Sequence, residues 1–182
     1  MGRYNTMSRL TMRRLRAAVV TAAAVLVLLT LSSAPALAFD HEANESTMLK
    51  LINHARTSRG LHALSSFDAL HDAALSHSAD MIKRDYFGHS SLGGAGVSAR
   101  ARRAGYSVSG WSQWTVGEVI AWGCGTRGTS QAVFKAWMHS SSHRSIILGK
   151  RWRDVGVGCA RGTFKGIRGV VMYTVDVGRR VQ

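Results

Sequence analysis

Apolar residues recur at helical spacing in three segments, each with a polar opposite face. Their apolar positions are Met48, Leu51, Ile52 and Ala55; Leu70, Ala74, His77 and Met81; and Val133, Phe134, Trp137 and Met138. The first predicted helix begins near residues 44–46 and stops at Gly60, and the second ends near Tyr86. The third has Thr129 or Ser130 as its N-cap, because both side chains accept hydrogen bonds from free helical N–H groups.

Alternation of apolar and polar residues appears later in the chain and predicts two strands. The alternating positions are Val155, Val157 and Cys159, and then Val171, Tyr173, Val175 and Val177. The glycines of 93–96 and 123–128 predict loops. Helices that precede strands favour an α+β domain in which helices pack on a small antiparallel sheet.

The first 38 residues have the organisation of a signal peptide, so residues 39–182 form the predicted domain. Arginines precede an uncharged apolar run from Ala17 to Leu31, and Ala36-Leu37-Ala38 offers a cleavage site before Phe39. The run has about 15 residues, fewer than the ~20 of a membrane-spanning helix. We therefore expect a protein secreted or associated with the cell wall, with no stable membrane span after processing. A retained anchor is the alternative, and Arg13-Arg14 also fits twin-arginine export.

The chain is strongly basic, with 24 Lys and Arg against 10 Asp and Glu and a formal net charge of +14. Loss of the five leader arginines lowers this charge to +9. Basic residues cluster in 100–103, 150–153 and 179–180. Export argues against a nucleic-acid partner, so a cell-wall polymer, a lipid headgroup, a peptide or simple solvation explains the charge better.

Two cysteines, Cys124 and Cys159, remain after processing. An even pair in an oxidising compartment predicts a Cys124–Cys159 disulfide, with two buried free thiols as the alternative. Their spacing does not resemble that of a zinc site.

Two histidines and one acid stand in otherwise apolar settings. His89 follows two aromatic residues, Glu118 interrupts an apolar run, and His143 follows a run of serines. Imidazoles and a carboxylate suit a divalent ion, with Zn²⁺ preferred. Glu118 can instead orient one histidine, or the three residues can form a buried hydrogen-bond network without an ion. We expect all three side chains to converge in one cleft.

A series of motifs in order resembles the CAP superfamily, which includes cysteine-rich secretory proteins, plant pathogenesis-related proteins and many bacterial secreted proteins. The motifs are Asn53-His54-Ala55-Arg56, Phe87-Gly88-His89, Arg100 with Gly105-Tyr106, Gly117-Glu118-Val119-Ile120-Ala121, Trp137-Met138-His139-Ser140, His143-Arg144 and Gly156-Val157-Gly158. The resemblance covers roughly residues 45–177, and the short loops resemble the bacterial branch.

The resemblance implies an α-β-α sandwich with a central cleft and a site of two histidines and two acids. His89, Glu118 and His143 match three of these positions, and Ser140 occupies the fourth, where many relatives have an acid. Val119 also replaces a usual asparagine. The missing acid argues against activities that need a carboxylate pair.

Two other arrangements of these residues are disfavoured. His139 and His143 have the spacing of a zinc helix, but the segment lacks the general-base glutamate of metalloproteases. A triad of Ser140 or Ser141 with His143 and Glu118 is conceivable. However, neighbouring residues of one helix seldom place a hydroxyl on an imidazole, and no nucleophile-elbow motif is present.

The sequence therefore favours a secreted binding module that is non-catalytic or binds a metal weakly. The alternative is a secreted peptidase-like hydrolase that uses His89, Glu118 and His143. A structural envelope protein would be a third class.

Overall fold

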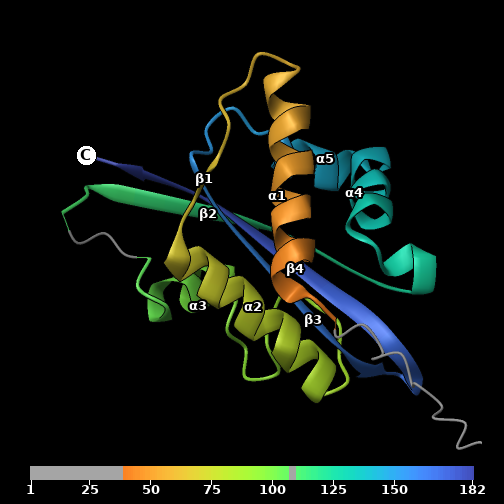
Figure 1. The fold of residues 1–182 in the computed structure, drawn as a ribbon. Helices are drawn as coiled ribbons and strands as arrows, with labels where there is room; N and C mark the ends of the chain where they lie inside the picture. Colours follow the sequence, from red (N-terminus) through yellow and green to blue (C-terminus); the bar gives the residue numbers. More distant parts are fainter. Residues whose placement is uncertain (1–38, 107–109) are drawn as a thin grey trace, which may run out of the picture. The chain divides into compact units, whose positions relative to one another are not determined.

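A computed structural model describes residues 39–106 and 110–182, and its centre is a four-stranded sheet (Figure 1). The strand order is β1-β3-β4-β2. Antiparallel pairing joins β2 to β4 and β3 to β4, whereas β1 pairs in parallel with β3. The antiparallel prediction is thus correct for the long strands and wrong for the two-residue edge strand. The strands are β1 (Ser65–Ser66), β2 (Gln113–Cys124), β3 (Asp154–Phe164) and β4 (Ile167–Val181).

Three helices cover one face of the sheet: α1 (His41–Thr57), α4 (Ser130–His139) and α5 (Ser141–Ile147). Alternate strand residues form a common core with them, because successive side chains of a strand point to opposite faces. Trp137 of α4 is buried in this core and donates from Nε1 to the carbonyl of Ile120, 3.2 Å away. This contact holds α4 against β2.

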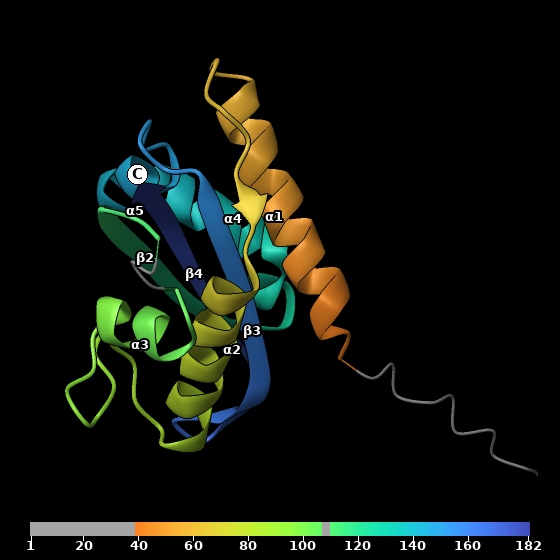
Figure 2. The same cartoon turned by 90° about the vertical axis from the view of Figure 1, so that its left-hand side faces the viewer.

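The other face is covered by α2 (Asp68–Lys83) and α3 (Val97–Arg103). Leu70 and Met81 of α2 and Ala101 of α3 are fully buried here. Figure 2 shows α2 and α3 in front of the strands and α4 and α5 behind them. Helices thus cover both faces, which confirms the α-β-α sandwich.

Local sequence explains most of the element boundaries. The α1 helix begins at His41, before the predicted start, because the Asp40 side chain accepts a hydrogen bond from the Ala43 N–H, 2.8 Å away. Thr129 caps α4, as predicted, by accepting from the Ala132 N–H. The periodicity did not predict β2, the seven-residue helices α3 and α5, or the 3₁₀ turn η1 (Gly125–Gly128).

Two glycines of β3 allow α2 to lie directly on the sheet. A Cβ atom on Gly156 would be 2.0 Å from the Leu70 carbonyl carbon, and one on Gly158 would be 2.1 Å from the Leu75 nitrogen. Because these are backbone atoms, no side-chain rotation would relieve the overlap. This close approach fixes the distance between α2 and the sheet. It therefore also fixes the position of His77, which belongs to α2.

The predicted Cys124–Cys159 disulfide is wrong, and both cysteines are free thiols. Cys159 of β3 aligns with Tyr173 of β4, whereas Cys124 of β2 aligns with Val170 of β4. Val170 and Tyr173 are three positions apart, an odd number, so their side chains point to opposite faces of the sheet, and so do the two thiols aligned with them. They also lie on strands that flank β4, so about two strand spacings of ~4.8 Å separate them. This exceeds the ~7 Å that a disulfide tolerates between Cα atoms.

Within residues 39–106 and 110–182, none of the helices has the length and apolar character of a membrane span. The signal-peptide prediction for residues 1–38 lies outside the described part of the chain.

Candidate functional site

The centre of the site is a hydrogen bond between a histidine and a buried carboxylate. Glu118 lies on β2 with a side chain that is only 2% exposed, and its Oε1 is 2.7 Å from Nδ1 of His89. His89 comes from the loop that follows α2, and its side chain is 62% exposed. This hydrogen bond raises the pKa of His89 above its ordinary value, and burial partly opposes the rise. The Nε2 atom of His89 remains available to a ligand.

Arg100 of α3 connects Glu118 to the loop that carries His89. Its Nη2 donates to Oε2 of Glu118, while Nη1 donates to the carbonyl oxygens of His89 and Ala95, at 2.9 and 2.7 Å. Its side chain is only 6% exposed. Both carboxylate oxygens of Glu118 are therefore engaged, one by His89 and one by a permanent cation. This arrangement makes Glu118 a group that orients His89 rather than a free general base.

His77 of α2 lies beneath the same cluster. It is buried, as expected for a core histidine, and its Nε2 donates to the Gly88 carbonyl, 2.9 Å away. The same atom is 3.9 Å from Oε2 of Glu118. Burial lowers the pKa of His77, and the charge of Glu118 only partly offsets this effect. His77 therefore fixes the position of the loop just before His89 while remaining neutral.

Asp176 of β4 is a second buried acid beside Glu118, and the motif analysis missed it. The two residues are aligned in the β2–β4 register, and Asp176 is fully buried. Neither of its carboxyl oxygens has a hydrogen-bond partner within the described residues. Burial, followed by the charge of Glu118, raises the pKa of Asp176 well above its ordinary value. We therefore treat Asp176 as a neutral acid in the folded protein.

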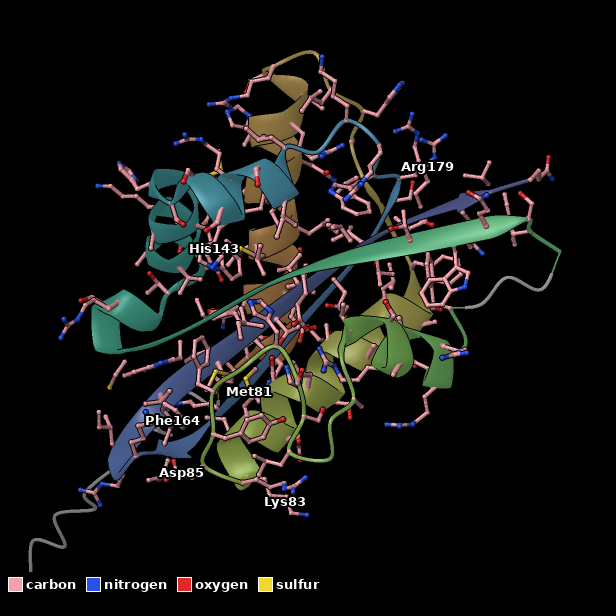
Figure 3. All side chains as sticks on the ribbon, turned by 180° about the vertical axis from the view of Figure 1, so that it is seen from behind. Met81, Lys83, Asp85, His143, Phe164 and Arg179 are labelled. Atoms are coloured by element: carbon pink, nitrogen blue, oxygen red, sulfur yellow. The ribbon has the colours of Figure 1, made fainter. Side chains whose placement is uncertain are left out.

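His143 belongs to α5, across β2 from helix α2 (Figure 3). Its Nδ1 is 2.8 Å from the Ser140 hydroxyl oxygen. Burial lowers the pKa of His143, and the nearby charge of His89 lowers it further. The two imidazoles thus influence each other electrostatically, but the hydrogen-bond network of Glu118 includes His89 and not His143.

The Ser140–His143 contact corrects one expectation from the sequence. Ser140 is not inside a helix, because its backbone is extended (φ −92°, ψ 121°) between α4 and α5. Its hydroxyl can therefore reach an imidazole three residues ahead. However, Glu118 is bonded to His89 and Arg100 instead of His143, so a Ser140–His143–Glu118 triad is not formed.

A metal with three or four protein ligands does not match the described geometry. Across residues 39–106 and 110–182, no group of three or more His, Cys, Asp or Glu side chains is close enough to hold an ion. Glu118 is occupied, so the atoms left for a cation are Nε2 of His89 and Nε2 of His143. Two imidazole ligands are fewer than the three protein ligands of a usual catalytic zinc site.

Comparison with known proteins agrees with this three-layer architecture. The model of the CAP family, described as the cysteine-rich secretory protein family, matches residues 49–175. The chain therefore belongs to the CAP family.

The similar proteins include bacterial members of this family. The uncharacterized protein YkwD of Bacillus subtilis is 33% identical over 129 residues, which are 71% of this chain and 46% of that protein. An extracellular SCP-domain protein from Bacillus anthracis is 25% identical with a TM-score of 0.61, over 76% of this chain and 41% of that one. This chain thus spans less than half of either protein. An outer surface protein from Borrelia burgdorferi shares the fold at 19% identity and a TM-score of 0.65, over 78% of this chain and 96% of that one.

Arg100, Asp176 and His77 are the site residues that sequence reasoning did not assign to the site; Arg100 was named only as part of a family motif. A signal for Asp176 was present, because a lone acid between Val175 and Val177 is unusual in a strand covered on both faces. His77 carried no such signal, since its position on an apolar helical stripe fits any core histidine. Its link to Glu118 depends on how closely α2 approaches the sheet.

Proposed function

We propose that this chain is an exported protein of the cell envelope that binds a ligand at the His89–Glu118 cleft without fast turnover. The observation that carries the proposal is the engagement of both Glu118 oxygens, one by His89 and one by Arg100. A carboxylate held by a guanidinium is a poor proton acceptor, and Ser140 occupies the position of the family's second acid. The cleft therefore has groups that orient and bind, but no free carboxylate base.

The ligand of this cleft includes a divalent cation, with Zn²⁺ preferred, bound weakly by Nε2 of His89 and Nε2 of His143. Both imidazoles are held at Nδ1, His89 by Glu118 and His143 by Ser140, and this arrangement leaves Nε2 of each ring for the ion. Two protein ligands supply less binding free energy than the three or four of a tight zinc site. Protons compete with the ion, so affinity rises with pH as His89 loses its proton.

The extracellular partner is an anionic polymer of the cell wall, and a basic surface supports this choice. Lys150, Arg151 and Arg153 precede β3, and the Arg153 N–H donates to Gly178, next to Arg179. The adjacent acid, Asp154, is already held by Tyr106 and Arg180. The four basic side chains therefore form a cationic surface at one end of the sheet. The extracellular relative from Bacillus anthracis is consistent with a location outside the cell.

Zinc titration of the mature protein at about pH 7.5 and pH 5.5 tests the cation site. We expect weak binding at the higher pH, weaker binding at the lower pH, and loss of binding in His89→Ala and His143→Ala. His139→Ala is the matched control, because His139 is exposed and bonds only to the Lys135 carbonyl. Binding that survives both cleft substitutions would place the ion elsewhere.

A secreted peptidase-like hydrolase using His89, Glu118 and His143 is the second candidate. The observation in its favour is the 2.8 Å contact between the Ser140 hydroxyl and Nδ1 of His143, whose lowered pKa keeps the ring neutral and therefore able to accept a proton. Peptide hydrolysis by the mature protein that disappears in His89→Ala and His143→Ala would favour this candidate over the binding module.

A further inference from the structure

A cavity lies between α2, α3 and the loop that joins them, and its volume is about 510 Å³. This volume is within the usual range for small-molecule sites. Small side chains line part of each wall, namely Ala73 and Ser76 of α2, Ala95 of the loop and Ala104 after α3, beside larger charged ones. Neither His89 nor His143 lines it. His77 and Arg100, which lie beside Glu118, do line it, so the cavity adjoins the cation site proposed above but does not include its two imidazoles.

The end of α3 lies beside the start of α2. Beyond the end of α3, Gly105 approaches Ala69 at the start of α2, since a Cβ atom there would be 4.0 Å from that of Ala69. Arg100, in the middle of α3, donates to the Ala95 carbonyl of the loop that precedes this helix. Arg103, late in α3, is therefore at the same end of the cavity as Asp72, in the second turn of α2.

Asp72 and Arg103 carry opposite charges, and neither forms an ion pair with Lys, Arg, Asp or Glu within the described residues. The Asp72 side chain is 69% exposed, and its one polar contact within the described residues is Nδ1 of His71 at 3.4 Å. Arg103 forms no side-chain hydrogen bond or ion pair with any residue of 39–106 or 110–182. Asp80 at the other end differs, because it accepts from Tyr86 and pairs with Arg84.

We propose that this cavity binds a small zwitterion, an amino acid or a dipeptide. The ligand's α-carboxylate lies on the Arg103 guanidinium, and its α-ammonium group lies on the Asp72 carboxylate. The alanines leave room for short side chains, and the Ser76 and Ser91 hydroxyls at the wall are available to the peptide group. Arginine suits the carboxylate because its planar guanidinium donates two parallel hydrogen bonds.

Calorimetric titration with alanyl-alanine tests the proposal, in EDTA so that a metal chelated by the dipeptide does not contribute. Each charged contact is expected to supply about 10-fold in affinity. Arg103→Gln should therefore weaken binding about 10-fold, while Arg102→Gln, an exposed neighbour on α3, should leave it unchanged. Asp72→Asn should have a similar effect to Arg103→Gln, with exposed Asp68→Asn as its control.

Capped dipeptides identify which charge meets which residue. N-acetyl-alanyl-alanine lacks the ammonium group, so it should bind the parent protein more weakly than alanyl-alanine does. The two ligands should bind the Asp72→Asn variant with equal affinity. Alanyl-alanine amide lacks the carboxylate, so it should bind the parent protein more weakly than alanyl-alanine does and bind the Arg103→Gln variant with equal affinity. No heat of binding at millimolar dipeptide, or equal affinity for capped and free forms, would overturn the proposal. Loss of binding in His89→Ala would assign the dipeptide to the other cleft.

Discussion

Replacing Arg100 by methionine should destabilise the fold severely. Methionine retains an unbranched apolar side chain of similar length, so the substitution mainly removes the guanidinium. Glu118, with 2% of its side chain exposed, then keeps a buried charge with only His89 as a partner. The carbonyl oxygens of His89 and Ala95 lose their donor as well.

The expected loss in the free energy of unfolding is about 3–5 kcal/mol, the cost of leaving one member of a buried ion pair without its partner. This is a large share of the ~5–15 kcal/mol that stabilises a typical domain. Urea unfolding at 25 °C and neutral pH, followed by tryptophan fluorescence, measures the change. Arg102→Met is the matched control, because Arg102 is exposed on the same helix and its replacement should cost less than about 0.5 kcal/mol.

A double variant separates the buried charge from the loss of packing. Arg100→Met with Glu118→Gln removes both charges, so it should be more stable than the sum of the two single effects predicts. The argument fails if Arg100→Met is as stable as Arg102→Met. It also fails if the two single effects simply add in the double variant.

Three further substitutions or labelling experiments test other parts of the structure. Gly158→Ala should cost about 1–3 kcal/mol in thermal unfolding because its Cβ would overlap backbone of α2, whereas Gly93→Ala, with no atom within 4 Å, should be nearly neutral. Native alkylation without reductant should label Cys124 but spare Cys159, whose pKa burial raises to about 12; a cross-linked product would contradict the strand register. The raised pKa of Asp176 makes its contribution to the free energy of unfolding greatest below pH ~4, and this contribution is lost as the pH rises through the folded-state pKa. The free energy of unfolding of Asp176→Asn, relative to that of the parent, should therefore be higher at pH 7 than at pH 4. Equal differences in urea stability at the two pH values would refute that assignment.

Helices with long apolar stripes were predictable from the sequence, whereas short or mixed elements were not. Met48 and Ile52 of α1 are four positions apart, as are Val133 and Trp137 of α4, and the structure buries all four. The seven residues of α3 and of α5 provide fewer than two repeats. The β2 strand was missed because residues 118–120 in its middle are buried at consecutive positions, so apolar and polar residues do not alternate there.

The candidate site was partly predictable because its motifs are local, while its connections are not. His89 and Glu118 were named from the sequence, and their 2.7 Å contact brings together a loop and a strand 29 positions apart. The contact of Arg100 with Glu118 depends on the packing of α3, which the periodicity did not reveal. The failed disulfide has a similar origin, since pairing two cysteines by count ignores the strand between them and the face to which each one points.

The placement of Cys124 and Cys159 on opposite sheet faces has a consequence for where the domain can fold. Its described residues need no oxidant and no disulfide isomerase, because hydrogen bonds and apolar packing alone hold the three layers together. Folding can therefore finish in a reducing cytoplasm as readily as in an oxidising exterior. The same native state is accessible in a reducing or in an oxidising medium.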